Sequence, residues 1–295
     1  MSNNIILNPS VQSSLRINPE AQAVRAGEMA TAFTDPGDVV KNEKMIRQLG
    51  KQMRPLLSRL QASQSHSILL VFQALDAAGK DSMIRALFSA QDPAIIKVAS
   101  FKSPSKIESR HDFLWRTNKQ LPARGEVCIF NRSYYEEVLV VRVHEGFLNS
   151  QYPKGIDNPA ELWPLRYQAI SAYEKHLASS GTLILKFWLN VSVEEQKKRF
   201  LSRLDQPKKR WKFNPTDVKE MAYRTAYDEA FADMVNATST DYAPWFMIPA
   251  DDKPRARMEV GKIVVEALQG MGLEYPQLDP EIAAELTTWQ SQLRE

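Results

Sequence analysis

The stretch SILLVFQALDAAGKDSMI, residues 67–84, decides the fold of this 295-residue chain. An apolar run, residues 68–72, leads into a loop of small residues that ends in Gly79-Lys80, and helix-forming residues follow at once. A buried strand that stops at such a loop and continues as a helix leaves backbone N–H groups unpaired. These donors, the positive end of the helix dipole and the Lys80 ammonium would converge on an anion. The stretch therefore predicts a phosphate-binding loop.

This loop departs from the phosphate-binding pattern G-x-x-x-x-G-K-[ST] at two positions. Ala74 stands where the first glycine belongs, and Asp81 replaces the Ser or Thr that normally contacts magnesium. Ser82 and Asp76 still offer oxygen ligands for a hard cation. The alternative is an ordinary strand–turn–helix junction with a surface lysine, and the loop alone does not decide between the two.

Composition indicates a globular chain with one substantial core, because 43% of the residues are apolar and 25% are charged. No run reaches the ~18 apolar residues that a membrane-spanning helix needs, and the N-terminus lacks the pattern of a secretory signal. The single cysteine, Cys128, lies in an apolar run, which favours a buried thiol over a nucleophile. These features predict a cytoplasmic protein without disulfides.

Positive charge is concentrated in one segment, residues 194–212, where eight lysines and arginines oppose three acidic residues and leave a charge of about +5. The whole chain carries only +3. A solvated helix face is the usual explanation for such a run. Here Pro207 interrupts it and Trp211 and Phe213 are interleaved with it, which predicts a helix, a loop and another helix. We expect these elements to form a movable lid, about residues 194–220, over an anionic substrate.

Apolar runs and helical patterns alternate along the chain. They predict strands at 68–72, 95–101, 126–130, 183–189 and 245–248, and helices at 38–60, 106–119, 134–142, 159–179 and 256–268, with Gly50 and Pro55 as possible breaks in the first helix. This order predicts an α/β fold whose parallel sheet is covered on both faces, with ligands at the carboxyl ends of the strands. We expect an N-terminal arm (1–37), one domain (38–270) that includes the lid, and a C-terminal tail or helix (271–295).

A second group of polar residues follows the third predicted strand. Arg132 can hold phosphate oxygens bidentately, and Asn131 precedes it. Ser133 and Glu136 also match a helix capping box, which is compatible with anion binding at the helix start. Glu136 and Glu137 are acidic beside a phosphate site, so we expect at least one of them to face a cation or a nucleoside.

The second predicted strand ends at Lys102, where nucleoside-monophosphate kinases with a phosphate-binding loop place a basic residue for the acceptor phosphate. Arg110, Asp112 and Arg116 follow as polar candidates, whereas His111 is expected to be a packed histidine. The four histidines and one cysteine are scattered and form no zinc pattern. Neither a G-x-S-x-G nor a strand-linked G-x-G-x-x-G motif is present.

Several blocks of the sequence resemble polyphosphate kinase family 2, most closely its class III subgroup. They are ALDAAGKDS, FKSPS, HDFLWR, LPARGE, FNRSYYEEVLVVRVH and RLDQPKKRWKFNPTD, and they lie in the expected order within residues 38–249. The resemblance implies a thymidylate-kinase-like P-loop fold and an Mg²⁺-dependent phosphotransferase. It further implies inorganic polyphosphate as donor, AMP and ADP as acceptors, and a homo-oligomer with no nucleic-acid or membrane partner.

The resemblance also implies roles for individual residues. Asp76, Lys80 and Arg132 would be catalytic, with Asp76 as the Mg²⁺ ligand because many relatives have Asp where this chain has Asn131. The nucleotide would contact Lys102, Arg110, Asp112, Arg116, Asn131, Glu136 and Glu137, of which Glu136 is linked to use of the monophosphate. Polyphosphate would contact Ala77, Ala78, Gly79, Lys80, Asp81, Ser82, Arg199, Arg203, Lys208, Lys209 and Lys212. Ser82 replaces a glycine that is common in relatives.

Two other functions remain as alternatives. An ATP-dependent kinase of the same fold would need no strongly positive lid and would favour a standard loop. A non-catalytic protein that binds nucleic acid through the basic segment would leave Asp76, Lys80 and Arg132 unexplained.

Overall fold

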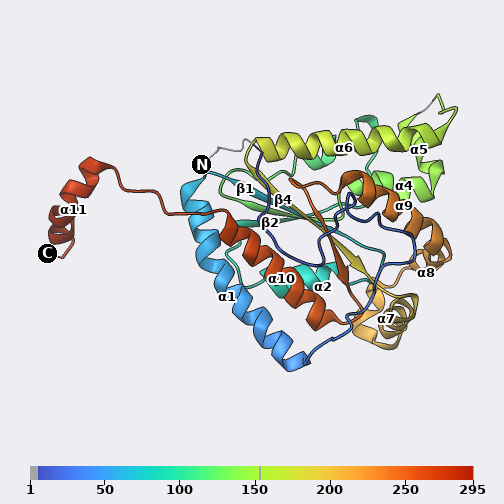
Figure 1. Ribbon diagram of the computed structural model, residues 1–295, viewed down its shortest axis with the longest axis horizontal. Coiled ribbons are helices and arrows are strands. Elements are labelled where there is room, and N and C mark those ends of the chain that lie inside the picture. Colours follow the sequence, from blue (N-terminus) through green and yellow to red (C-terminus); the bar gives the residue numbers. More distant parts are fainter. Residues whose placement is uncertain (1–5, 153, 295) are drawn as a thin grey trace.

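A parallel five-stranded sheet forms the centre of the computed structural model, which describes residues 6–152 and 154–294 (Figure 1). The strands are β1 (Ser67–Gln73), β2 (Ile96–Ser100), β3 (Val127–Asn131), β4 (Thr182–Asn190) and β5 (Trp245–Pro249), in the order β2-β3-β1-β4-β5. β1 lies in the middle, between β3 and β4, and is buried along its whole length. The predicted parallel sheet is confirmed, and the loop after β1 lies at its centre.

Helices cover both faces of the sheet. On one face α1 (Val39–Ser63), α2 (Lys80–Phe88) and α10 (Lys253–Gly270) pack on Leu70 and Phe72 of β1. On the other face α4 (Val140–Val143), α6 (Leu162–Ser179) and α9 (Arg224–Thr238) pack on Leu69 and Val71. Alternate residues of a strand point to opposite faces, so one apolar run supplies both cores. Cys128 on β3 is buried, as predicted, and burial raises the pKa of its thiol to about 12.

Two of the predicted helices differ from the structure. α1 is not interrupted at Gly50 or Pro55, because Met53 and Leu60 of the same face are fully buried and hold it against the core. The helix predicted at 106–119 is wrong: only η1 (Glu108–Arg110) and α3 (Trp115–Asn118) form there. Short polar side chains compete for the backbone in this segment, as when Asp112 Oδ1 accepts the N–H of Leu114 at 3.0 Å.

Several shorter elements connect the sheet to the helices. The helix predicted at 134–142 is divided into η2 (Tyr134–Val138) and α4, and η3 (Glu145–Phe147), α5 (Leu148–Gln151) and η4 (Pro159–Glu161) lead into α6. The segment expected to form the lid, about residues 194–220, contains α7 (Val193–Asp205), η5 (Pro207–Lys212) and α8 (Pro215–Glu220), which agrees with the predicted helix, turn and helix, and η6 (Met221–Tyr223) follows it. No sequence signal identified α9, which follows the lid.

The N-terminal segment packs along the outer edge of β5. Ile17 N–H donates to Trp245 O at 2.9 Å, and Met247 N–H donates to Leu15 O at 2.8 Å. This pairing is antiparallel and covers an edge strand that would otherwise expose its backbone. Residues 1–5 of the expected arm lie outside the described residues.

At the other end of the chain, α11 (Pro280–Gln292) extends away from the body (Figure 1). Within residues 6–152 and 154–294, no helix has the length and apolar character needed to cross a membrane.

Candidate active site

A cavity of about 1610 Å³ opens at the carboxyl ends of the strands, where the sequence predicted ligand binding. Its walls come from the loop after β1, the residues after β2 and β3, α4, and the lid. Segments more than a hundred residues apart in the chain therefore meet around one space.

The loop after β1 has the geometry of a phosphate-binding loop. Gly79 has a φ of +108°, a conformation that favours glycine, and it caps α2. Lys80 Nζ folds back on the loop and donates to Ala74 O at 2.6 Å and Leu75 O at 3.4 Å. The side chain is only 8% exposed, and burial together with the charge of Arg132 lowers its pKa to about 8. An anion in the cavity would favour the charged ammonium.

Arg132 meets the loop from the end of β3. Its Nη2 donates to Asp76 Oδ1 at 2.6 Å, and its own backbone has a φ of +64°. Burial disfavours its charge, but the carboxylates of Glu136 and Asp76 raise the pKa of the guanidinium above its ordinary value. Lys80 and Arg132 thus line the same cavity, as expected from the sequence.

A buried polar network fixes the segment behind Arg132. Tyr134 and Tyr135 each donate a hydroxyl hydrogen bond to Glu174 Oε1 at 2.8 Å. Lys186 Nζ on β4 donates to Glu174 Oε2 at 2.6 Å and to Tyr135 Oη at 2.7 Å. These contacts satisfy the buried charges and hold η2 against the sheet. Sequence reasoning missed this network, because Lys186 lies in an apolar run without any motif.

The predicted capping box after Arg132 forms only in part. Ser133 Oγ accepts the N–H of Tyr135 at 3.1 Å and so caps η2. Glu136 does not return to Ser133; its Oε1 accepts from Gln73 Nε2 at 2.9 Å, and it lines the cavity. Its carboxylate therefore belongs to the site rather than to the cap.

The cavity brings together most of the predicted nucleotide contacts: Lys102, Arg116, Asn131, Glu136 and Glu137. Arg116 Nη1 donates to Lys102 O at 2.6 Å. Glu137 is 2% exposed and lies between the guanidinium groups of Arg116 and Arg166, each 3.6 Å away, so it is bound within the protein. Asn131 Nδ2 donates to Asp81 Oδ1 at 2.7 Å.

Arg110 and Asp112 are exposed and do not line the cavity, so their predicted contact with nucleotide has no geometric support. They lie in the segment whose helix was wrongly predicted. Of the predicted lid cations, Arg199, Arg203, Lys209 and Lys212 line the cavity, whereas Lys208 is exposed outside it. The polyphosphate role of Lys208 stays a prediction.

The structure adds residues that the sequence did not single out. Asp217 of α8 lies near the loop: burial and the charge of Asp76 raise the pKa of its carboxyl, while Arg203 at 3.3 Å counters them. His144 Nε2 lies 2.8 Å from Glu220 Oε2 and joins α4 to the lid. His144 and Asp217 are the last residues of two sequence blocks that resemble the family, FNRSYYEEVLVVRVH and RLDQPKKRWKFNPTD. Their presence in these blocks is the sequence signal that could have identified them.

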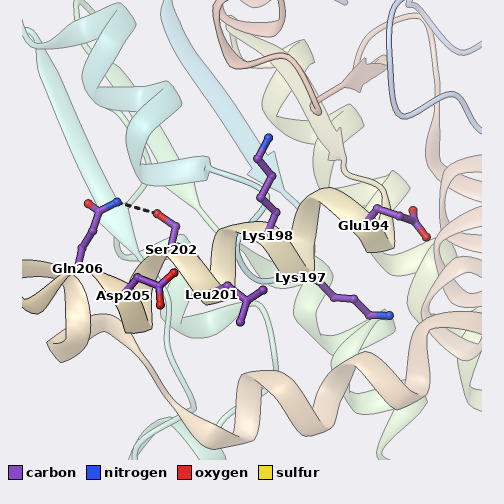
Figure 2. A pocket seen from close by; sticks show the side chains of 7 residues that line it. All are labelled: Glu194, Lys197, Lys198, Leu201, Ser202, Asp205 and Gln206. Atoms are coloured by element: carbon purple, nitrogen blue, oxygen red, sulfur yellow. Dashed lines mark hydrogen bonds between the residues drawn. The ribbon is translucent and has the colours of Figure 1, made fainter.

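A second, smaller cavity of about 610 Å³ lies along α7 (Figure 2). It is lined by Glu194, Lys197, Lys198, Leu201, Ser202, Asp205 and Gln206, and Gln206 donates to Ser202 Oγ at 2.9 Å. Only Lys198 and Ser202 of these also line the large cavity. None of the residues that follow the strands reaches this surface, which excludes it as the predicted site.

The donor set of the large cavity fits magnesium. Within the described residues there is no group of three or more His, Cys, Asp or Glu side chains that could hold a metal ion. Mg²⁺ does not require one, since it is usually bound by one or two carboxylates together with substrate phosphates and water. Asp76, with Asp217 nearby, offers such carboxylates.

A parallel sheet whose central strand passes through a Gly-Lys loop into a helix, opposite an arginine and a basic lid, defines a P-loop kinase. The family model described as Polyphosphate kinase 2 (PPK2) matches residues 38–276. The chain belongs to the polyphosphate kinase 2 family.

Individual relatives agree with this assignment. The chain is 43% identical over 251 residues to an ADP-polyphosphate phosphotransferase of Rhodopseudomonas palustris, covering 85% of this chain and 87% of that one. It is 42% identical over 237 residues to an AMP/ADP-polyphosphate phosphotransferase of Meiothermus ruber, covering 80% and 84%. A crystal structure of polyphosphate kinase 2 from Arthrobacter aurescens TC1 superposes with a TM-score of 0.81 at 35% identity, covering 93% of this chain and 97% of that one. These matches confirm the expected P-loop kinase-like fold.

Proposed function

We propose that this protein transfers the terminal phosphoryl group of inorganic polyphosphate to AMP or ADP. The single observation that carries the proposal is the shared cavity of Lys80, Arg132 and the cations of the lid. Membership of the family and the names of the relatives support the same reaction.

The cavity offers different surfaces to donor and acceptor. Lys80 and the N–H groups of the loop would hold the phosphoryl group that is transferred, and Arg203, Lys209 and Lys212 would follow the polymer. A flexible row of cations suits a chain with one charge per phosphate. Lys102 would face the acceptor phosphate, and Glu136 lines the same cavity. Arg116 is buried and pairs with Lys102 O and Glu137, so it would support Lys102 rather than contact the phosphate itself.

Transfer would proceed in line. A terminal phosphate oxygen of the nucleotide attacks the end phosphorus of the polymer, and the bond from that phosphorus to the bridging oxygen breaks, so the shortened polymer leaves with the electron pair. Such a reaction depends on positioning and charge neutralisation rather than on a covalent enzyme intermediate. Lys80 and Arg132 would supply positive charge for this purpose, and the guanidinium of Arg132 would keep its charge at any working pH. Mg²⁺, held by Asp76 and the phosphates, would neutralise further charge.

The test is to incubate the protein with Mg²⁺, long-chain polyphosphate and AMP, and to resolve AMP, ADP and ATP by chromatography. We expect ADP and then ATP to form, and removal of Mg²⁺ to abolish both. A parallel reaction with ATP as the donor to AMP distinguishes a conventional kinase. If ATP supports faster transfer than polyphosphate, the proposal is wrong. Salt-sensitive binding of DNA or RNA without any transfer would instead favour the nucleic-acid alternative.

The remaining partners belong to the same proposal. We infer a cytoplasmic homo-oligomer that binds neither nucleic acid nor membranes. The sequence has a single cysteine and so no pair for an intramolecular disulfide, which is compatible with a reducing compartment. Light scattering of the purified protein tests the oligomer.

A further inference from the structure

Side chains hold the backbone of the phosphate-binding loop through its carbonyl groups. Five successive backbone carbonyls, those of residues 74–78, each accept a hydrogen bond from a side chain. Lys80 serves the first two of them. The other three are held by two residues of the lid helix α7: Gln196 Nε2 donates to Asp76 O at 2.8 Å, and Arg199 Nη1 donates to Ala77 O at 3.2 Å and Ala78 O at 2.7 Å.

Arg199 has no donor left for a substrate. Besides the two loop carbonyls, its Nη2 donates to Ala250 O at 2.6 Å and Asp251 O at 3.1 Å, in the loop that follows β5. Its Nε donates to Glu195 Oε1 at 2.8 Å. A guanidinium carries five N–H donors, and these contacts use all of them. The side chain is 7% exposed.

The hydrogen bonds to the loop carbonyls also determine the direction in which the following N–H groups point. In a planar trans peptide the C=O of one residue and the N–H of the next point in opposite directions. Among the described residues, no protein acceptor takes the N–H of Ala77 or Gly79. Since the carbonyls of Asp76 and Ala78 are held by α7, these two N–H groups point away from α7 and remain for a phosphate.

The hydrogen bonds from α7 also maintain an unfavourable backbone conformation at Ala77. Ala77 has a φ of +61°, in the left-handed region that residues with a side chain seldom adopt. Such a conformation persists only when surrounding contacts determine it. Ala77 is the residue whose carbonyl Arg199 holds.

We propose that Gln196 and Arg199 are positioning residues that hold the backbone of the phosphate-binding loop in its anion-binding form, and that Arg199 is not a ligand of polyphosphate. Because both belong to α7, the shape of the loop depends on the position of the lid. This inference rests on the proposed function and changes the role that the family resemblance implied for Arg199.

The first test is rescue by glycine. Arg199→Met removes two of the three hydrogen bonds that α7 donates to the loop, and we expect kcat to fall roughly 100-fold, the scale of a misplacement of about 1 Å. Ala77→Gly allows the left-handed conformation without strain. Added to Arg199→Met, it should restore kcat at least about 5-fold, while in the wild-type background it should not raise kcat. A residue that merely contacts the polymer would not be rescued by a glycine in the loop, so failure of rescue in a folded double variant overturns the proposal.

The second test separates positioning from contact with the polymer. Each cation that binds a phosphate chain adds to the salt dependence of affinity, with a slope of roughly 0.7–0.9 per contact in nucleic acids. Lys212→Met, a lid cation that lines the cavity without holding the loop, should lower this slope for long-chain polyphosphate. Arg199→Met should leave the slope unchanged and weaken affinity for tripolyphosphate about 10-fold, measured by calorimetry. A lower slope in Arg199→Met would identify Arg199 as a ligand after all.

Two further measurements guard against misfolding and against failure of the proposed function. Gln196→Leu removes only one hydrogen bond from α7 to the loop and should show a smaller fall in kcat in the same direction, with KM for AMP unchanged. If the wild-type protein does not use polyphosphate, the proposed function fails. Tripolyphosphate affinity and its rescue by Ala77→Gly then still test the positioning role, since neither requires turnover.

Discussion

Replacing Lys80 by methionine should remove activity and yet not destabilise the protein. Methionine can follow the same buried path without a charge, so the phosphate loses its ammonium partner. We expect turnover to fall by a factor on the order of 10²–10³, the scale of a lost transition-state donor. Stability should respond differently, because the charged form of this lysine is unfavourable in the fold. Burial and the nearby charge of Arg132 lower its pKa from 10.5 to about 8.

This difference of about 2.5 in pKa corresponds to about 3 kcal/mol, by which the charged Lys80 lowers the free energy of unfolding at pH 7. Methionine removes that cost but leaves the carbonyls of Ala74 and Leu75 without their side-chain donor, a loss of about 1–3 kcal/mol. At pH 7 the variant should therefore be between about 0 and 2 kcal/mol more stable than the wild type.

The sign of the pH dependence follows from the lowered pKa. Below pH 8 the lysine is protonated in both the folded and the unfolded chain, and the full cost is present. Between pH 8 and 10.5 the unfolded chain keeps a proton that the folded chain has released, so the wild type gains stability as the pH rises. Over this window the stability of the wild type should rise by about 3 kcal/mol relative to Lys80→Met.

Urea unfolding of both proteins at several pH values between about 7 and 10.5 measures this difference, and subtraction removes the groups that titrate in both. Lys197→Met is the matched control, because Lys197 of α7 is exposed and, unlike Lys80, does not line the large cavity (Figure 2). It shows what the loss of an exposed lysine charge does by itself. A difference between wild type and Lys80→Met that stays constant across the window would refute the electrostatic argument, and near-wild-type turnover would refute the role of the ammonium.

Three further predictions concern other positions. Gly261→Ala should lower the free energy of unfolding in urea by between about 0 and 2 kcal/mol, because a Cβ there would meet Leu49 Cδ1 at 3.0 Å and Leu87 Cδ2 at 3.1 Å, at a cost of about 1–3 kcal/mol, while alanine gains about 1 kcal/mol of helix propensity over glycine; a raised midpoint would contradict the tight packing of α1, α2 and α10. Arg132→Lys should reduce turnover roughly 10–100-fold with little change in melting temperature, since an ammonium does not reproduce bidentate contact; full activity would contradict this role. Glu136→Gln should raise the ratio of ADP to AMP turnover, because loss of a negative charge favours the more anionic acceptor; competition kinetics with both nucleotides measures this ratio, and an unchanged ratio would contradict the role of the Glu136 charge.

Local patterns were sufficient to predict the sheet. Apolar runs such as the one at 68–72 are buried on both faces, and this requirement can be read from a few consecutive residues. The turn into α2 was equally local, since it depends on Gly79 and Lys80. The prediction of a helix at 106–119 was wrong because of other local interactions. Polar side chains in this segment accept hydrogen bonds from neighbouring backbone N–H groups, and these bonds outweigh the helical spacing of the apolar residues.

The sequence predicted most of the charged residues that line the candidate site. It did not predict which of them face the cavity and which pair with other groups of the protein. Arg199 and Lys212 both lie in the basic segment of the sequence, yet one holds backbone carbonyls and the other faces the cavity. Glu137 looks like its neighbour Glu136 but is bound between two arginines. The sequence shows which side chains are charged. The partners of each charged side chain depend on which distant segment of the chain packs against it.

The order of apolar and small residues by itself determined that this chain forms a parallel sheet with a phosphate-binding loop at its centre, because strand burial and loop conformation are set by neighbours in the chain. Only the tertiary structure decided that α7 holds the back of that loop and that Asp217 approaches Asp76. Those contacts join residues more than a hundred positions apart, and hydrogen-bond donors are committed by direction and distance, which exist only once the chain has folded.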